Sequence, residues 1–215
     1  MTDWAAMAAV PGEDGVLRCG WCLSSADYVD YHDNEWGRPV VDDVRLYEKL
    51  CLEGFQSGLS WLTILRKREA FRAAFADFEP TTVAAFGERD VERLLGDAGI
   101  VRHRGKIEAT IANARAMLSV QEELGSLAAL VWSFEPPRAG RGVPRRLGDV
   151  ASVTPESTAM SKELRRRGFR FIGPTTAYAA MQSLGVVDDH LDGCHVRDAC
   201  EAERLALPKP RVPEG

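Results

Sequence analysis

The chain has 215 residues, of which 45% are hydrophobic, 27% are charged and 8% are aromatic. This length and composition are typical of one soluble domain with a buried core, and they exclude a globally disordered chain. No apolar run approaches the roughly 18 residues that a membrane helix needs, and the N-terminus lacks the basic start of a signal peptide. We therefore expect a cytoplasmic protein without a membrane partner.

The net charge of −5 argues weakly against a nucleic-acid partner, but the charge is unevenly distributed. Between Arg138 and Arg170 there are nine basic residues and three acidic ones. A basic patch on an acidic protein can still bind phosphates, because binding responds to the local field. A solvated loop and helix face would give the same count, so charge alone leaves both interpretations open.

Helical periodicity extends over most of the chain and predicts an all-α fold. In chain order, helices are expected over residues 42–51, 61–75, 81–86, 90–95, 106–118, 124–134, 159–167 and 175–184. No segment alternates with a period of two for long enough to predict a sheet. We expect a flexible N-terminal extension over 1–16, a single two-lobed domain over 17–200 and a C-terminal tail over 201–215. Residues 135–158, rich in Pro, Gly and Arg, form the expected long loop.

A cysteine and a histidine near each end of the chain have spacings that suit a metal ion. Twelve residues separate Cys19 from His32, and three separate His190 from Cys194. The second spacing places both side chains on one face of a helical turn. Two cysteines and two histidines make the closed tetrahedral shell of structural zinc sites. Such a site would join the N- and C-terminal segments.

The spacing leaves alternatives open for these ligands. Cys22 forms a CxxC pair with Cys19, and His195 competes with His190. Chance spacing is about equally compatible with the pattern, because scattered pairs are weak evidence for a metal site. A redox CxxC is disfavoured because no βαβ unit surrounds it.

A second cluster combines aromatic rings with one carboxylate. The rings lie within residues 21–61: Trp21, Tyr28, Tyr31, Trp36, Phe55 and Trp61. Glu53 lies among them in an otherwise apolar helical segment, where an unpaired charge would be costly to bury. It therefore needs a protein donor or a cationic ligand as partner. Rings around a carboxylate suit a flat, positively charged ligand, although each ring by itself is better explained as core.

The motifs that contain these residues resemble the bacterial DNA-3-methyladenine glycosylase I family. The matching segments are residues 18–21 (RCGW), 28–37 (YVDYHDNEWG), 53–61 (EGFQSGLSW), 97–107 (DAGIVRHRGKI), 168–173 (GFRFIG) and 189–194 (DHLDGC). The resemblance implies an α-helical protein of the helix-hairpin-helix glycosylase superfamily. It also implies that the protein flips 3-methyladenine out of alkylated double-stranded DNA and hydrolyses its N-glycosidic bond, with free 3-methyladenine as product.

The resemblance assigns roles to particular residues of this sequence. The zinc ligands are Cys19, His32, His190 and Cys194, which leaves Cys22 and His195 outside the site. The base pocket consists of Glu53 as the catalytic carboxylate, Trp61 as the stacking ring, and the wall residues Tyr28, Tyr31 and Trp36. Leu59 falls near the segment expected to probe the DNA stack. Departures from the family are peripheral and concern the N-terminal extension, residues 135–150 and the tail after Cys200.

A hairpin over residues 168–174 is expected to hold a DNA phosphate. Its glycines allow a tight turn, and free amides at a helix N-terminus bind anions without reading sequence. The DNA-binding positions are Gly168, Gly173, Thr175 and Thr176. Because the hairpin contains no lysine, a Schiff-base lyase step is not expected.

Two other functional classes compete with a monomeric, monofunctional glycosylase. One is a zinc-stabilised helical protein that binds DNA without catalysis, its aromatic residues forming only core. The other is a zinc hydrolase or deaminase, which needs an open metal position that four protein ligands do not leave. Asp188 and Asp189 lie where many superfamily relatives place a catalytic aspartate. In this family that aspartate is not expected to play the usual catalytic part, and Asp189 is a candidate for supporting the metal ligand His190, while the sequence leaves a catalytic contribution of either aspartate open.

Overall fold

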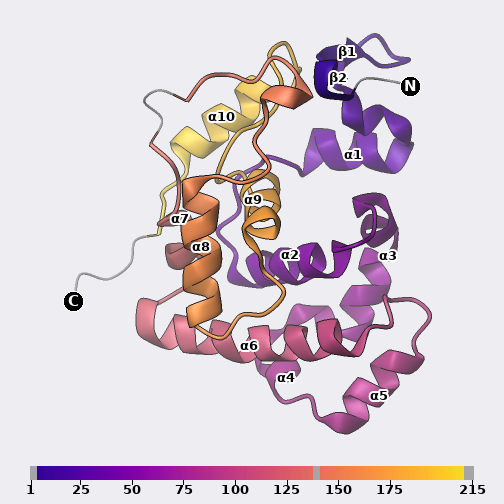
Figure 1. Cartoon of the computed structure of the whole chain (residues 1–215), viewed down its shortest axis with the longest axis vertical. Helices are drawn as coiled ribbons and strands as arrows, with labels where there is room; N and C mark the ends of the chain where they lie inside the picture. The colour runs from indigo at the N-terminus through magenta and orange to yellow at the C-terminus, as the bar shows by residue number, and fades with distance from the viewer. Residues whose placement is uncertain (1–3, 138–140, 211–215) are drawn as a thin grey trace.

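The computed structural model describes residues 4–137 and 141–210 (Figure 1). Its elements are η1 (Trp4–Ala6), β1 (Ala9–Pro11), β2 (Leu17–Cys19), η2 (Gly20–Ser24), α1 (Ala26–Asn34), α2 (Asp43–Gln56), α3 (Trp61–Ala74), η3 (Ala76–Phe78), α4 (Pro80–Ala84), α5 (Glu88–Gly96), α6 (Arg104–Leu124), α7 (Leu127–Trp132), η4 (Leu147–Asp149), α8 (Pro155–Arg166), α9 (Pro174–Ser183) and α10 (Arg197–Ala206). The mostly helical fold expected from the sequence is confirmed. Arg138, one of the basic residues counted above, lies outside the described residues.

Side-chain caps fix where the central helices begin. Asp42 accepts a hydrogen bond from the backbone N–H of Arg45 at 2.9 Å, as expected for an N-cap of α2. Ser60 does the same for α3 through Thr63. Because α2 ends at Gln56 and Ser60 caps α3, only residues 57–60 connect the two helices, and this short connection brings the start of α3 beside the end of α2.

Helix α2 lies near the centre of the molecule and contacts α3, α6, α7 and α9 (Figure 1). Leu46, Leu50 and Phe55 are fully buried, or nearly so, in the main hydrophobic core. The hydroxyl of Tyr47 donates to the carbonyl of Thr110 in α6 at 2.8 Å. A helix that is buried on nearly all sides provides a rigid support for a functional side chain.

The N-terminal segment departs from the sequence-based expectation. Residues 9–11 pair antiparallel with residues 17–19 to form a two-stranded sheet, which the sequence analysis did not predict. Strands of three residues are too short to show a period of two. Instead of lying apart from the domain, the extension also contacts the loop before α8, because the Leu147 N–H donates to the Met7 carbonyl at 2.9 Å.

Helices α8 and α9 contact each other and are joined by a tight turn over residues 167–173, and this pair is referred to below as the α8–α9 hairpin. Gly168 has φ +99°, a conformation that favours glycine, and Phe171 has φ +58°. The turn is fastened to α6, because the Asn113 side chain accepts from the Arg170 N–H at 2.7 Å and donates to its carbonyl at 3.3 Å. Helix α8 begins at Pro155, inside the segment predicted as loop. In the described residues, no helix is both long and apolar enough to cross a membrane.

Candidate functional site

An aromatic cavity of about 330 Å³ lies where α1, α2, α3 and α9 meet the segment around η4. Its lining includes all the residues predicted for the base pocket: Tyr28, Tyr31, Trp36, Glu53 and Trp61. Further lining comes from Trp21, Gln56, Leu147, Val150, Ala179, Gln182 and Asp189. The structure therefore combines residues from five parts of the sequence into one hollow that is mostly apolar and contains a few polar groups, which is typical of a small-molecule site.

Glu53 is a buried carboxylate at the wall of this cavity. It lies on the last turns of α2 and is 6% exposed. Its Oε1 atom lies 3.1 Å from the ammonium of Lys49, one helical turn earlier. The partner that a buried Glu53 requires is thus a protein cation. Sequence reasoning missed Lys49, although a lysine four residues before a glutamate in an apolar helix was the available signal.

Tyr31 and Trp61 line the same cavity as Glu53. Their ring centroids lie 5.5 Å apart at an interplanar angle of 43°. The Tyr31 hydroxyl accepts a hydrogen bond from Lys49 at 2.6 Å. Burial raises the pKa of Tyr31 well above its ordinary value, so its hydroxyl stays protonated at neutral pH.

The other rings that line the cavity pack against one another. Trp21 makes edge-to-face contacts with Tyr28 and Trp36, with centroids 5.5 and 5.3 Å apart. Tyr28 is fixed because its hydroxyl accepts from the Leu62 N–H at the start of α3 at 2.9 Å. These contacts hold the rings in place before any ligand binds.

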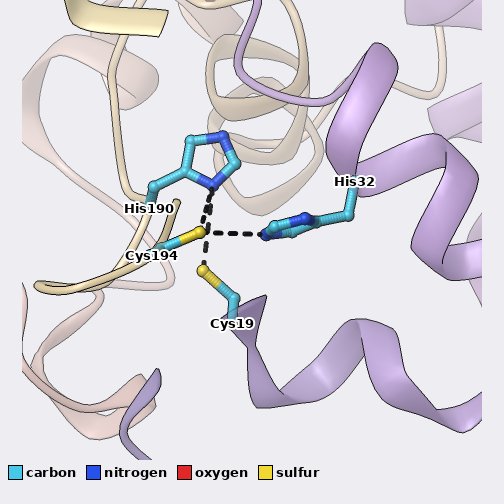
Figure 2. Close-up of side chains that lie close together, drawn as sticks. All are labelled: Cys19, His32, His190 and Cys194. Carbon is cyan, nitrogen blue, oxygen red and sulfur yellow. Dashed lines mark hydrogen bonds between the residues drawn. The ribbon is translucent and has the colours of Figure 1, made fainter. Parts of the chain in front are cut away.

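Four buried side chains form a second cluster next to the aromatic wall. Figure 2 shows Cys19, His32, His190 and Cys194 converging from β2, α1 and the segment before α10. The Cys194 Sγ lies 3.5 Å from His32 Nε2 and 3.7 Å from His190 Nδ1, and Cys19 Sγ lies 3.8 Å from the same His190 nitrogen. This group could hold a metal ion.

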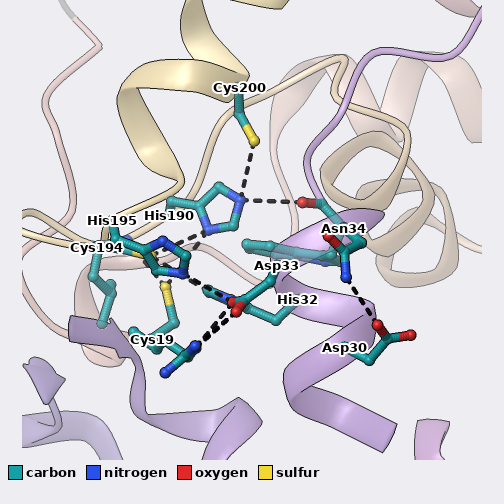
Figure 3. Close-up of polar contacts among 12 residues, drawn as sticks. Cys19, Asp30, His32, Asp33, Asn34, His190, Cys194, His195 and Cys200 are labelled. Atoms are coloured by element: carbon teal, nitrogen blue, oxygen red, sulfur yellow. Dashed lines mark hydrogen bonds and ion pairs between the residues drawn. The ribbon is translucent and has the colours of Figure 1, made fainter. Parts of the chain in front are cut away.

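The outer nitrogens of both histidines have fixed partners (Figure 3). His32 Nδ1 lies 2.7 Å from an Asp33 carboxylate oxygen, and His190 Nε2 lies 3.1 Å from the Trp36 carbonyl. Arg18 holds Asp33 through its Nε at 2.9 and 3.0 Å. Although burial opposes it, hydrogen bonds from Arg18, His32 and His195 lower the pKa of Asp33. Sequence reasoning missed Asp33, whose position next to His32 was the only signal.

The competing ligands lie outside this group of four. Cys22 is buried without belonging to it. His195 belongs to a different group, with His32 and Asp33, and its Nε2 lies 3.0 Å from the Asp33 carboxylate. The two thiols of this group of four shift each other's pKa in opposite directions. A hydrogen bond between them lowers the pKa of Cys194 and raises that of Cys19.

Neither aspartate before His190 contacts the ring of that histidine in the described structure. Asp188 accepts a hydrogen bond from the His190 backbone N–H at 3.0 Å. Asp189 lines the aromatic cavity, but its oxygens accept from Tyr178 at 2.6 Å and Gln182 at 2.8 Å, and it pairs with Arg141. The expected support of His190 by Asp189 is therefore wrong, and the Trp36 carbonyl takes that place.

The residues predicted to bind DNA lie in two surface segments. Leu59 is 43% exposed in the connection between α2 and α3. Gly168, Gly173, Thr175 and Thr176 lie in the turn of the α8–α9 hairpin and the first turn of α9. The turn approaches α2 next to Glu53, because a Cβ on Gly54 would lie 3.4 Å from the Phe171 Cβ and carbonyl oxygen. Phe171, 44% exposed, is a surface aromatic residue that the sequence analysis did not single out.

Part of the basic charge on this hairpin is neutralised. Arg166 pairs with Glu163, and Arg167 pairs with both Glu163 and Glu123. Among the described ion pairs, none involves Arg165 or Arg170, and both side chains are exposed. The cationic surface of the hairpin is therefore smaller than a count of arginines suggests.

The chain is similar to bacterial DNA repair enzymes over most of its length. A family model described as methyladenine glycosylase matches residues 21–198. The chain is 49% identical over 177 residues to DNA-3-methyladenine glycosylase 1 of Escherichia coli K12, covering 82% of this chain and 95% of that protein. It is 45% identical over 177 residues to the DNA-3-methyladenine glycosylase of Haemophilus influenzae, covering 82% and 96%.

The fold of the chain is also similar to solved structures of 3-methyladenine DNA glycosylase I over most of its length. A crystal structure of 3-methyladenine DNA glycosylase I matches with a TM-score of 0.79 at 49% identity, covering 83% of this chain and 98% of that one. The glycosylase I of Staphylococcus aureus, solved to explain its recognition of 3-methyladenine, matches with a TM-score of 0.80 at 36% identity. That match covers 84% of this chain and 96% of the Staphylococcus aureus chain.

Proposed function

Because this chain belongs to the methyladenine glycosylase family, and is therefore an enzyme acting on N-glycosyl bonds in DNA, we propose that it excises 3-methyladenine from alkylated duplex DNA. The family membership predicted from the sequence motifs is confirmed. The observation that carries the proposed substrate is the position of Glu53, a buried carboxylate on the wall of a cavity lined by Tyr and Trp rings. The cavity, at about 330 Å³, is at the small end of ligand sites and suits a single base.

The chemistry of the lesion explains why this pocket would select it. Methylation at N3 makes the adenine of the intact nucleotide cationic, which already weakens the glycosidic bond. Water then adds at C1′ of the sugar and loses a proton to the solvent, while the electrons of the glycosidic bond leave with the base, so that the base departs as neutral 3-methyladenine. An ionised Glu53 stabilises the cationic base by a charge-assisted hydrogen bond, and the rings stabilise it by stacking and cation–π attraction. Neutral adenine gains only the stacking.

The surface around the cavity suits a base that has been flipped out of the helix. Extrusion breaks stacking and pairing, at a free-energy cost of a few kcal/mol. Leu59 can fill the space left in the stack, because it is exposed in the connection that leads directly into Trp61. The amides at the start of α9, in the segment of Gly173, Thr175 and Thr176, can bind a backbone phosphate together with Gly168.

Hydrolysis without a lyase step agrees with the positions of the lysines. A Schiff base needs an amine that can reach the sugar carbon. The turn over 167–173 has no lysine. Lys49, the lysine next to Glu53, is engaged by Glu53 and Tyr31. We therefore propose a monofunctional glycosylase.

We also propose that Cys19, His32, His190 and Cys194 hold a structural zinc ion. Zinc–sulfur and zinc–nitrogen bonds of about 2.3 and 2.0–2.1 Å put neighbouring corners of a tetrahedron about 3.5–3.6 Å apart. The sulfur–nitrogen distances of 3.5, 3.7 and 3.8 Å fit that geometry. Two thiols, two imidazoles and fixed outer partners are a donor set that zinc prefers. The ion would join β2 and α1 to the segment before α10, and with four protein ligands it would not take part in hydrolysis.

Binding of the free base tests the proposed substrate. We expect 3-methyladenine to quench the tryptophan fluorescence of the protein saturably, because Trp21, Trp36 and Trp61 line the cavity. At a mildly acidic pH at which 3-methyladenine is protonated and adenine is not, adenine should bind at least about tenfold more weakly, because it lacks the positive charge that the Glu53 carboxylate stabilises. A folded protein that bound both bases equally, or neither, would contradict the proposed substrate.

A further inference from the structure

Lys49 is a buried lysine whose ammonium has three partners at the base cavity. It lies 3.1 Å from Glu53 Oε1, 2.6 Å from the Tyr31 hydroxyl and 3.4 Å from the centre of the Trp61 ring. A lysine ammonium has three N–H donors, so each donor has one partner: a carboxylate, a hydroxyl and a π face. These three partners are also three walls of the cavity.

Lys49 lies over the Trp61 ring but is not among the residues that line the base cavity. It lines a separate hollow of about 50 Å³, and Trp61 lines both this hollow and the base cavity. The Trp61 indole N–H is buried and has no hydrogen-bond partner among the described residues. The ring is therefore held by packing and by the ammonium behind it, so that its other face is available for stacking.

Four of the charged residues around Lys49 are paired with one another, whereas Lys49 itself pairs with Glu53. The small hollow is also lined by charged residues, namely Glu35, Arg45, Glu48, Arg68 and Arg72. Arg68 pairs with Glu35 at 2.6 Å and Arg72 pairs with Glu48 at 2.9 Å. Burial lowers the pKa of Lys49, and the Glu53 charge opposes this shift.

Glu53 in turn depends on this arrangement. No hydrogen bond to Glu53 Oε2 is found in the described structure, whereas Oε1 lies 3.1 Å from the Lys49 ammonium. One carboxylate oxygen is thus held by the ammonium while the other remains for a ligand. A carboxylate that lost its ammonium at 6% exposure would take up a proton more readily, because burial disfavours the charged form.

We propose that Lys49 is a positioning residue that determines specificity for the methylated base, by keeping Glu53 ionised and oriented and by fixing Trp61 from behind. This inference rests on the proposed function of the cavity. It assigns Lys49 no contact with the base and no proton transfer. Its effect passes through Glu53, so losing Lys49 should matter only while Glu53 is present.

A double-mutant cycle with Lys49→Met and Glu53→Gln tests this dependence. The readout is the affinity for free 3-methyladenine, measured by equilibrium dialysis, which does not rely on the fluorescence of Trp61. We expect Lys49→Met to weaken binding about tenfold or more, as for loss of an interaction with a charged group. In the Glu53→Gln background, Lys49→Met should change affinity by less than about twofold, because coupled residues are not additive.

The pH profile provides a second readout. The deficit of Lys49→Met relative to the parent should grow as the pH falls from neutral to mildly acidic, because burial disfavours the charged form of a carboxylate that has lost its cation. Titration of the free base is common to every variant and cancels in the ratio of affinities. If Lys49→Met does not fold, as judged by circular dichroism, Lys49→Gln replaces it, because its amide still donates a hydrogen bond.

Lys106 provides the matched control, because its burial equals that of Lys49, at 7% exposure each. Its ammonium donates to the carbonyls of Phe55 at 2.8 Å and Ser57 at 2.7 Å. Lys106→Met therefore removes a buried ammonium near the end of α2 without removing the partner of Glu53. We expect its effect on affinity to add to that of Glu53→Gln and to show no growing deficit at acidic pH.

The outcomes separate this inference from the proposed function. If the parent binds 3-methyladenine and Glu53→Gln weakens binding, but Lys49→Met has no effect or an additive one, the role of Lys49 is refuted and the proposed function stands. If the folded parent does not bind the base, both are refuted. A Lys49→Met effect that disappears without Glu53 and deepens at acidic pH supports the inference.

Discussion

Removal of the proposed zinc ion should destabilise the protein by a measurable amount. A ligand that binds only the folded state, at about a thousand times its dissociation constant, stabilises that state by about 4 kcal/mol. In a domain of this size, each kcal/mol shifts the melting temperature by about 2–4 °C, so complete removal should lower it by about 8–16 °C. The cluster joins Cys19 to His190, which are 171 positions apart in the sequence. Unfolding without the metal should therefore begin where the N-terminal and C-terminal segments meet at the cluster.

The assay combines calorimetry with metal analysis and hydrogen exchange. Cys194→Ser should lose the ion, melt earlier and exchange faster in β2, α1 and residues 188–194. Cys51→Ser is the matched control, because Cys51 is a buried thiol in α2 that faces Asn113 and does not belong to the cluster. It should keep about one zinc ion per chain, whatever its effect on melting. If complete removal of the metal shifted melting by less than about 2 °C, the reasoning from binding to stability would be refuted.

Two further predictions concern the DNA-facing surface and the hairpin. Leu59→Ala should leave the affinity for free 3-methyladenine unchanged but slow excision from duplex DNA by about tenfold or more, because about 2 kcal/mol of apolar contact in the stack is lost; an equal loss in both assays would contradict this role. Hydrogen bonding to Arg166 lowers the pKa of Glu163 from 4.5 to about 2. Its contribution to stability is therefore complete above pH 4.5 and is lost as the pH falls toward 2, so Glu163→Gln should be less stable than the parent by about 1 kcal/mol or less near neutral pH. In urea unfolding this difference should shrink between pH 6 and about pH 3, and a difference that did not change with pH would refute the assignment.

Sequence patterns predicted the long amphipathic helices but not the elements around the metal cluster. Helices α2, α3 and α6 were found because aliphatic residues recur on one face. Helix α1 was missed because its buried positions are Tyr31 and His32, which a count of aliphatic residues does not recognise. Helix α10 was missed because its buried residues are Cys200 and Arg204. These elements are held by polar contacts to distant segments, and such contacts have no local periodicity.

The cavity could be predicted better than its charges. Spacing and composition placed the aromatic residues near Glu53, because residues 28–61 lie close together in the chain. The electrostatic partners could not be read from the sequence in the same way. Asp189 accepts hydrogen bonds from Tyr178 and Gln182 and forms an ion pair with Arg141. Two of the four arginines on the hairpin are paired with glutamates. Pairing depends on rotamers and on long-range packing, which a count of charges does not contain.

Base release from methylated duplex DNA tests the central claim most directly. The parent and Glu53→Gln are compared by chromatography of the released bases, after both are shown to be folded and to have the same metal content. The parent should release free 3-methyladenine, and Glu53→Gln should release it at least about tenfold more slowly, because it loses the charged hydrogen bond to the base. Equal release by the two proteins, or no release by the folded parent, would contradict the account.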